Sequence, residues 1–188
     1  MNTAHPPKHV GDLLERIQGG SEFDYLLFWG HRARADGQVS ASCFSQWFPA
    51  PFIVEGDRYL TAEHFMMAGK ARLFDDAAAL ARVLAAVDPG AAKAVGRQVR
   101  GFDEATWQAH RFDIVVRANR AKFAQHPAMA EYLLRTGDQV LVEASPFDTI
   151  WGIGLSASHD RARDPSQWRG LNLLGFALMQ VRAELRAA

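Results

Sequence analysis

A glutamate and a lysine seven residues apart make the segment Thr61–Lys70 (TAEHFMMAGK) a candidate for chemistry. Residues with this spacing on an α-helix are offset by only about 20° around the axis, so Glu63 and Lys70 share one face. Met66 and Met67 lie between them on that face. An apolar stripe with an ionisable group at each end is typical of the wall of a ligand pocket. It also fits a helix at the boundary of the core, whose methionines pack inside while its charged groups reach water.

The predicted position of Glu63 affects its pKa in two opposite ways. Thr61 is a suitable N-cap, which places Glu63 at about the second position of the helix. The helix macrodipole stabilises a carboxylate there, whereas burial in an apolar pocket raises the carboxyl pKa. The sequence leaves open which effect is larger.

A second segment, Glu143–Leu155 (EASPFDTIWGIGL), places a carboxylate in a tight turn. Asp148 follows Ser-Pro-Phe, and one interpretation is an Asx-turn whose side chain organises the loop. The other is a carboxylate presented to a ligand at a strand edge, where Gly152 lets the backbone approach closely and Trp151 supplies a stacking face. Both interpretations stay open.

Two further positions are candidates for substrate binding. Asn172 stands at the start of an apolar helix, where it would act as a helix cap, as a ligand donor, or as both. Arg32, next to His31, follows a predicted strand and could meet a phosphate group. Trp47 and Trp107 have residue types that are more often found in a core than on a ligand platform.

The sequence lacks the motifs of several common enzyme classes. It has no glycine-rich phosphate loop, no dinucleotide-binding fingerprint and no Gly-x-Ser-x-Gly nucleophile motif. Glu63-His64 has no second histidine at the spacing of a zinc protease helix, and the single cysteine completes no set of metal ligands. We therefore expect neither a metal nor an organic cofactor.

Length and composition favour one globular domain in the cytoplasm. The 188 residues have ordinary hydrophobic (48%) and charged (22%) fractions. No apolar run approaches the length of a membrane span, and the N-terminus lacks the apolar region of a secretory signal. A lone cysteine, Cys43, fits a reducing compartment. The formal net charge is zero, so we expect any contact with nucleic acid to be local, to one nucleotide.

Hydrophobic spacing and capping residues predict a mostly helical α+β domain with a small β-sheet. The predicted helices span residues 10–17, 61–72, 75–87, 88–101, 103–125, 128–136 and 172–186. The predicted strands span residues 24–29, 52–54, 59–60, 140–143 and 150–155. We expect residues 1–22 to be an N-terminal extension with a short helix and residues 23–188 to form the domain.

Several segments, in order along the chain, carry a family resemblance. They are FWGH at 28–31, SQWFPAPF at 45–52 with TAEHFMMAGKARLF at 61–74, LVEASPFDTIWGIGL at 141–155 and WRGLNLLGFALMQVR at 168–182. Together they resemble the NADAR family of YbiA-like N-glycosidases over about Tyr25–Arg182. The resemblance implies an α+β fold and hydrolysis of N-glycosidic bonds to a ribose.

The resemblance also implies substrates and site residues. The substrates would be phosphoribosylamino-pyrimidines of riboflavin synthesis, or ADP-ribose attached to the guanine amino group in nucleic acid, including ADP-ribosylated DNA. The family pattern places function on Glu63, Lys70, Trp107, Asp148, Trp151 and Asn172. Many relatives carry Leu-Ser-Asn before a Phe-Tyr-Pro stretch, whereas this chain has Phe44-Ser45-Gln46-Trp47, so its local substrate contacts can differ.

Two chemical routes fit these residues. In a ribosylated exocyclic amine, opening of the sugar ring gives an imine at C1, which Lys70 could trap as a Schiff base. Glu63 would move the protons, and Asp148 would position water or a ribose hydroxyl. In the other route water displaces the base directly through an oxocarbenium-like state, and Lys70 acts only through its charge. We prefer the Schiff base because Lys70 shares a face with Glu63.

A non-catalytic module that binds ADP-ribose or a nucleotide is the main alternative. Such a module needs aromatic stacking and a phosphate contact, but not Glu63, Lys70 and Asp148 together. A third possibility is a structural domain in which these residues are solvated or cap helices. The joint match of the segments favours the enzyme, and the sequence gives no indication of the oligomeric state.

Overall fold

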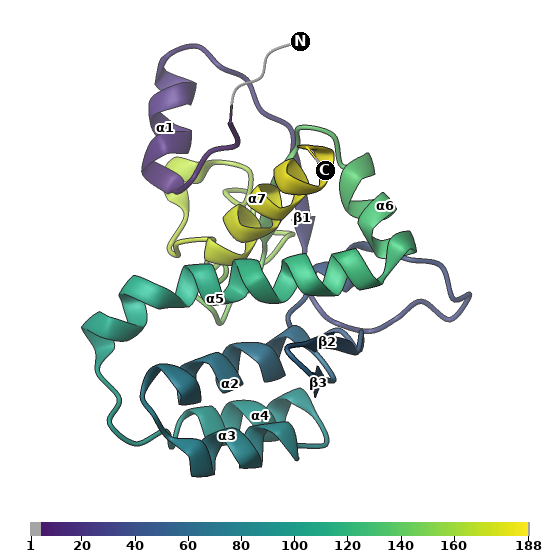
Figure 1. Ribbon diagram of the computed structural model, residues 1–188. Helices are drawn as coiled ribbons and strands as arrows, with labels where there is room; N and C mark the ends of the chain where they lie inside the picture. The colour runs from purple at the N-terminus through teal and green to yellow at the C-terminus, as the bar shows by residue number, and fades with distance from the viewer. Residues whose placement is uncertain (1–4, 188) are drawn as a thin grey trace.

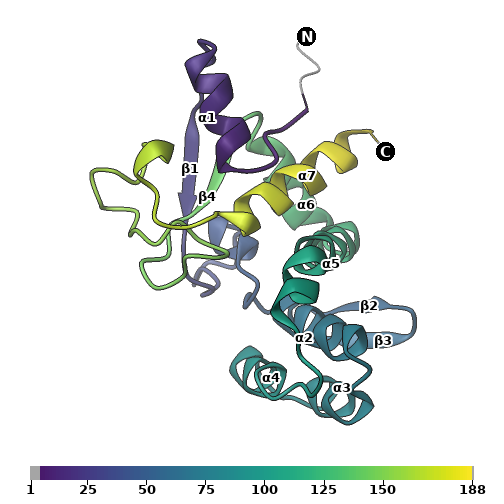
Figure 2. The ribbon, with the colours of Figure 1, turned by 90° about the vertical axis from the view of Figure 1, so that its left-hand side faces the viewer.

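A computed structural model describes residues 5–187 of the chain. Its centre is the long helix α5 (Glu104–Gln125), which has other elements on both sides (Figures 1 and 2). Asp103 caps this helix as predicted, because its carboxylate accepts hydrogen bonds from the N–H and the hydroxyl of Thr106. Helix α5 packs against α2 on one side and α7 on the other, and so joins two halves of one core.

One half consists of three helices and a hairpin, in the lower part of Figure 1. It contains α2 (Ala62–Leu73), α3 (Ala77–Leu84), α4 (Pro89–Gly96) and the antiparallel strands β2 (Phe52–Val54) and β3 (Asp57–Tyr59). Each of the three helices begins after a residue whose side chain accepts a hydrogen bond from the first turn. These residues are Thr61, Asp76 and Asp88.

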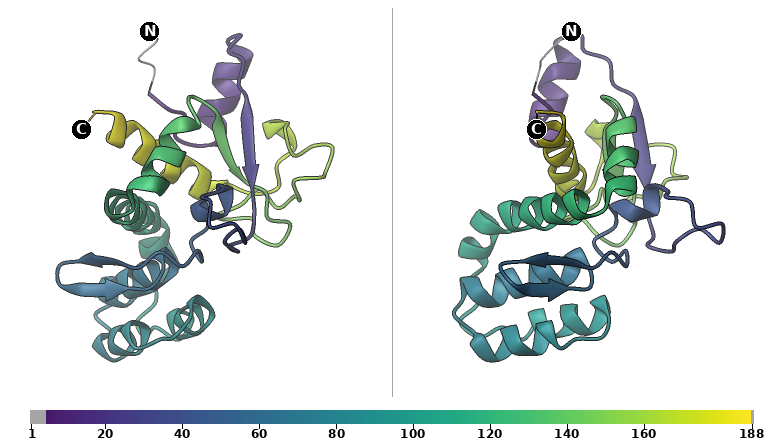
Figure 3. Two further views of the ribbon diagram at one scale, coloured as in Figure 1. Left: turned by 90° about the vertical axis from the view of Figure 1, so that its right-hand side faces the viewer. Right: turned by 45° about the vertical axis from the view of Figure 1, so that its right-hand side comes forward.

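The other half holds a parallel strand pair covered by helices (Figure 3). Strands β1 (Tyr25–Phe28) and β4 (Val140–Glu143) pair in parallel, with Phe28 opposite Glu143. Helices α6 (Pro127–Arg135) and α7 (Leu173–Ala187) belong to this half, and α7 packs on β4. Gly175 allows that contact, since a Cβ added there would lie 2.0 Å from the carbonyl oxygen of Leu141.

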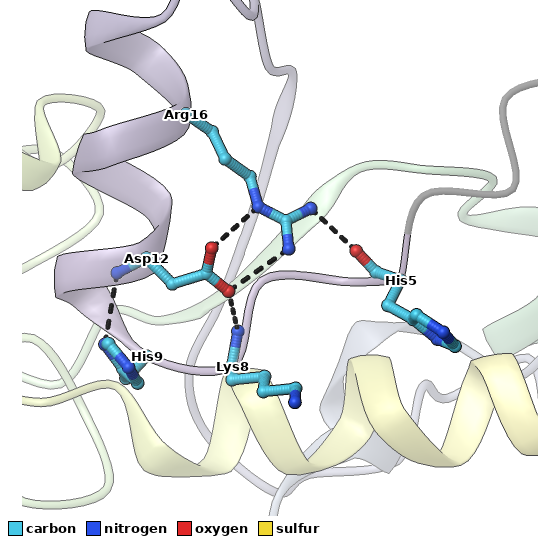
Figure 4. Close-up of polar contacts among 5 residues, drawn as sticks. All are labelled: His5, Lys8, His9, Asp12 and Arg16. Atoms are coloured by element: carbon cyan, nitrogen blue, oxygen red, sulfur yellow. Dashed lines mark hydrogen bonds and ion pairs between the residues drawn. The ribbon is translucent and has the colours of Figure 1, made fainter.

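Helix α1 (Val10–Gln18) is held to the segment before it by polar contacts (Figure 4). Arg16 donates from Nε to Asp12 and from Nη1 to the carbonyl oxygen of His5, both at 2.7 Å. The backbone N–H of Lys8 donates to the other Asp12 oxygen at 2.8 Å. These residues belong to the predicted N-terminal extension, whose first four residues lie outside the described part. Its boundary with the domain stays a prediction.

The α+β class and the single, mostly helical domain are confirmed. The strands of the described residues form two separate two-stranded sheets, of which one is the predicted hairpin. Two short 3-10 helices, Ala41–Phe44 and Pro165–Gln167, lie in regions without a predicted element. No helix in the described part of the chain has both the length and the apolar character needed to cross a bilayer.

The predicted strand at 150–155 is wrong. The side chain of Asp148 accepts hydrogen bonds from the N–H groups of Ile150 and Trp151, and Gly154 adopts a φ of 69°. These bonds and this backbone angle turn the chain where a strand would extend it. The helices predicted at 75–87 and 88–101 are shorter than expected, since α3 begins only after its cap and α4 ends at Gly96 in a tighter turn.

Candidate functional site

A cavity of about 200 Å³ lies where the two halves meet. Helices α2 and α4 and the start of α5 form part of its wall, and loops from the other half close it. Its lining residues are Ser45, Gln46, Trp47, Glu63, Met66, Met67, Lys70, Lys93, Gly96, Arg97, Trp107, Glu143, Asp148 and Trp151. The cavity brings together residues that are up to about a hundred positions apart in the sequence.

The predicted stripe on α2 forms one wall of this cavity. Glu63, Met66, Met67 and Lys70 all line it, as the helical spacing predicted. Phe65 lies on another face of the helix and packs against Tyr59 at 4.9 Å between ring centroids. Glu63 is only 2% exposed, so the alternative in which its carboxylate reaches water is wrong.

Glu63 is fixed at the start of α2 by backbone contacts. Its own N–H donates to the carbonyl oxygen of Gln46 at 2.9 Å. Thr61 caps the helix, and its hydroxyl also lies 2.8 Å from Nδ1 of His64. The other ring nitrogen of His64 lies 3.2 Å from the carbonyl oxygen of Ala86, which can only accept, so this nitrogen carries the proton. The first turn of α2 is therefore fixed by the loop at Gln46 and by the carbonyl group of Ala86.

Burial dominates the electrostatics of Glu63. Its Oε1 atom is buried and has no hydrogen-bond partner among the described residues. Burial raises the pKa of Glu63 to about 7, although the charge of Lys93 and the side chain of Trp47 act in the opposite direction. The helix macrodipole therefore does not keep this carboxyl strongly acidic, and near neutral pH a large fraction of Glu63 is protonated.

Glu143 is a second cavity carboxyl, in a half-buried residue that the sequence analysis did not single out. It ends strand β4, and its Oε2 atom is buried without a hydrogen-bond partner in the described structure. Burial, with the negative charges of Asp148 and Glu63, raises the pKa of Glu143 to about 8. The only sequence signal was a glutamate at the end of the apolar run Val140–Val142. The cavity thus holds two carboxyl groups that disfavour each other's ionisation.

Asp148 forms the predicted Asx-turn. One oxygen, Oδ1, accepts hydrogen bonds from the N–H groups of Ile150 (2.8 Å) and Trp151 (2.7 Å). The same residue lines the cavity and is only partly buried. One carboxylate oxygen, Oδ1, therefore organises the loop, in a residue that also borders the cavity.

Lys70 lies at the aromatic end of the cavity. Its ammonium nitrogen is 4.0 Å from the ring centroid of Phe102 and 5.5 Å from that of Trp107. Partial burial lowers the pKa of Lys70, against the opposite effect of the Glu104 charge. Seven residues of helix separate the Cα atoms of Glu63 and Lys70 by roughly 10 Å. A substrate that contacts both side chains must span the cavity.

Asn172 and Gly152 are predicted substrate contacts, but neither residue lines the cavity. The Asn172 side chain is fully buried, accepts a hydrogen bond from the N–H of Glu143 and donates one to the carbonyl oxygen of Leu141, both at 2.9 Å. A Cβ added to Gly152 would lie 2.8 Å from the carbonyl oxygen of Glu143. Both residues therefore position the end of β4, and Gly152 allows a close approach of backbone to backbone.

The loop that carries Gln46 is supported by two buried polar residues of α5. Asn119 donates to the Gln46 side chain at 2.8 Å. Lys122, which is completely buried, donates to the carbonyl oxygens of Cys43 and Ser45. Burial lowers the pKa of Lys122 to about 8. The central helix thus holds the segment whose carbonyl group in turn holds Glu63.

The remaining predicted residues divide between the cavity and the surface. Trp107 and Trp151 line the cavity, whereas Arg32 is exposed in the loop after β1 and is not part of the lining. Trp47 also lines the cavity, although the sequence analysis favoured a core position for it. Lys93 and Arg97 line it as well, and nothing in their Ala-rich segment singled them out.

The described residues hold no group of three or more histidine, cysteine, aspartate or glutamate side chains arranged to bind a metal ion. Three carboxyl residues share the cavity, and the raised pKa values of Glu63 and Glu143 suit proton transfer.

Comparison with known proteins identifies relatives over most of the chain. The model of the NADAR domain matches residues 27–186. The chain is 41% identical over 165 residues to an N-glycosidase of Acanthamoeba polyphaga mimivirus, which covers 85% of this chain and 95% of that protein. It is 35% identical over 132 residues to the chloroplastic riboflavin biosynthesis protein PYRR of Zea mays, which covers 66% of this chain but 19% of that protein.

The fold is also similar to a solved structure. The NMR structure of the Escherichia coli protein YbiA matches with a TM-score of 0.68 and 26% sequence identity. The match covers 89% of this chain and 88% of that one. The overall fold is therefore shared with this relative.

The buried carboxyl of Glu63 predicts how stability depends on pH. Between the ordinary pKa of 4.5 and the folded value of about 7, the folded state binds the proton more strongly, so stability falls as the pH rises. Glu63→Gln removes this loss. Urea denaturation should show similar stability of variant and wild type at pH 5. At pH 8 the variant should be more stable by on the order of 2–3 kcal/mol.

The exposed Glu22 supplies the control for this measurement, because its carboxylate is in water. Glu22→Gln should leave the pH dependence of stability as it is in the wild type. Parallel curves for wild type and Glu63→Gln would show that the folded protein does not favour the protonated form of Glu63.

Proposed function

The chain belongs to the NADAR domain family, and from this membership and its cavity we propose that it is an N-glycosidase that hydrolyses the bond between a ribose and the amino group of a base. The observation that carries the proposal is Glu63, a buried carboxyl with a raised pKa that lines a cavity. Relatives named N-glycosidase and riboflavin biosynthesis protein support the same reaction class.

The substrates that we propose are phosphoribosylamino-pyrimidines from riboflavin synthesis, or ADP-ribosyl-guanine in nucleic acid. The cavity of about 200 Å³ is smaller than the ~300–1,000 Å³ typical of pockets that enclose a whole drug-sized ligand. It would enclose the ribose and the bond to be broken, while the rest of the substrate stays outside. The net charge of zero favours a single nucleotide or a small molecule over a long nucleic-acid contact.

The first chemical requirement is a proton for the departing amine. An amino group leaves as a neutral amine only when its nitrogen gains a proton. Glu63 and Glu143 both have raised pKa values, so one of them is protonated at neutral pH and is able to donate. Removing water from around the two carboxyl groups is what makes this proton available.

Lys70 supplies the nucleophile in our proposal. Opening of the ribose ring gives an imine between C1 and the base nitrogen, and the neutral Lys70 amine adds to C1. The base nitrogen takes a proton from a carboxyl group and leaves, and C1 remains bound to Lys70 as a Schiff base. Water then adds to C1, Lys70 leaves, and the free sugar aldehyde forms. The lowered pKa of Lys70 increases the fraction of neutral amine.

Asp148 acts in the hydrolytic step. One of its oxygens is bound by the loop, and the other is left to position the attacking water or a ribose hydroxyl. Trp107 and Trp151, both partly buried at the cavity, offer flat faces for the base. Asn172 acts through Glu143, because its side chain holds the end of β4.

A module that only binds nucleotides is the second candidate. It is favoured by the aromatic lining, but it does not require two carboxyl groups that each have a buried oxygen without a hydrogen-bond partner among the described residues. Such groups destabilise a folded protein at neutral pH. Their presence therefore favours a function that needs them, such as proton transfer.

The direct test is incubation of the purified protein with a phosphoribosylamino-pyrimidine and, separately, with DNA that carries ADP-ribosyl-guanine. We expect mass spectrometry to detect free ribose phosphate or ADP-ribose from one of them. Glu63→Gln should lower kcat by about 10²- to 10⁴-fold, which is typical of the loss of a general acid, and leave substrate binding largely intact.

The exposed residue Glu22 again provides the control, since Glu22→Gln removes the same charge outside the cavity. Unchanged substrates that nevertheless bind to the wild type would contradict the enzyme and support the binding module. Full turnover by Glu63→Gln would overturn the role of this carboxyl.

Borohydride trapping tests the Schiff base. Reduction during turnover should add the mass of the sugar moiety to the protein, and peptide mapping should place the adduct on Lys70. Lys70→Arg should abolish the adduct, because a guanidinium does not form a Schiff base, whereas Lys8→Arg should retain it. Turnover without any adduct would favour direct attack by water, and an adduct on Lys93 would assign the nucleophile to the other lysine of the cavity.

A further inference from the structure

Two cations, Lys93 of α4 and Arg97 at the C-cap of this helix, line the cavity without an acidic partner. No carboxylate among the described residues forms an ion pair with either side chain. Lys93 is half-buried and lies 5.7 Å from the ring centroid of Trp47, whereas Arg97 is exposed. One cation therefore lies deeper in the cavity, and the other lies nearer to water.

The packing of α4 on α2 aims these two residues into the cavity. Gly96 lies between them, and a Cβ added there would be 2.0 Å from the sulfur of Met67. This close approach of the helices leaves Lys93 and Arg97, four residues apart, on one side of α4. Both then face the same cavity as Glu63.

Two explanations within the protein account for these cations only in part. Positive charges near the end of α4 interact favourably with its macrodipole, but that effect does not require them to line a cavity. They also lower the pKa of Glu63, yet burial outweighs them and that pKa stays raised. Two like charges four residues apart repel each other, so an anion between them would relieve a destabilising contact.

We propose that Lys93 and Arg97 bind the phosphate group on C5 of the substrate ribose. This inference rests on the proposed function, since it assumes that the ribose occupies the same cavity. With C1 between Lys70 and the carboxyl groups, the far side of the sugar presents its phosphate to Lys93 and Arg97. The anion would be either the phosphomonoester of a phosphoribosyl compound or the first phosphate of ADP-ribose. The pair thus selects phosphorylated ribosides over plain ribosides.

Calorimetric binding of ribose 5-phosphate, ribose and ADP-ribose tests this assignment without catalysis. We expect ribose 5-phosphate to bind the wild type at least about tenfold more tightly than ribose, because charge-assisted hydrogen bonds are strong. The double variant Lys93→Gln/Arg97→Gln should lose this preference. Lys93→Arg should keep it, and binding should weaken as salt is added.

The matched control is Arg82→Gln, which removes an exposed cation from the neighbouring helix α3 outside the cavity. It should bind ribose 5-phosphate as the wild type does. Tighter binding of ADP-ribose than of ribose 5-phosphate would identify the phosphate source as a nucleoside diphosphate sugar, and the reverse order would identify a phosphomonoester. Either order supports the assignment if the double variant loses both ligands.

Equal binding of ribose 5-phosphate by the wild type and the double variant would overturn the proposal, as would equal binding of ribose and ribose 5-phosphate by the wild type. If the double variant fails to fold, Arg97→Gln alone decides, since its side chain is exposed. Phosphate binding that depends on these residues, without turnover of any substrate, would retain this inference and contradict the proposed enzyme. Turnover with the same KM in wild type and Arg97→Gln would support the proposed enzyme and contradict the assignment of the phosphate site.

Discussion

A buried carboxyl group with one oxygen that has no hydrogen-bond partner among the described residues is the constraint on which this site depends. Glu63 lies in the first turn of α2, where a helix favours a negative charge, yet burial outweighs that preference and raises its pKa to about 7. Keeping water away requires the loop at Gln46, which is held by the central helix through Asn119 and Lys122. The elements on both sides of α5 therefore exclude water from the Glu63 carboxyl group.

The cavity separates its charges into groups with different surroundings. Glu63 is buried, and its charge adds to the effects that raise the pKa of the half-buried Glu143. Lys70 lies against the rings of Phe102 and Trp107, about two helical turns from Glu63. This separation gives a proton donor, an amine and an anion-binding edge within one small cavity. A net charge of zero for the whole chain conceals this local arrangement.

The sequence predicted those parts of the site that depend on local geometry. Helical spacing placed Glu63 and Lys70 on one cavity wall, and cap residues such as Thr61 marked where helices begin. It could not predict Glu143 as a cavity residue, because the burial of its oxygen depends on elements far away in the chain.

The same limit explains the residues whose places differed from expectation. Asn172 looked like a cap or a ligand donor, but its partners are backbone groups of β4 that only the tertiary fold brings near. The residues after Ile150 have the composition of a strand, yet the Asp148 side chain competes for their N–H groups and makes a turn. Arg32 stays exposed, and α4 supplies the cations instead.

The most direct measurement is an NMR titration of the side-chain carboxyl carbons in protein labelled with ¹³C-glutamate, assigned with Glu63→Gln and Glu143→Gln. The account predicts that the resonances of Glu63 and Glu143 titrate near pH 7 and pH 8, above the ordinary glutamate value of 4.5. It also predicts that each substitution lowers the pKa of the remaining carboxyl, because one negative charge is removed. Titration of both groups near 4.5 would contradict the account, since the cavity would then hold no carboxyl able to protonate a leaving amine at neutral pH.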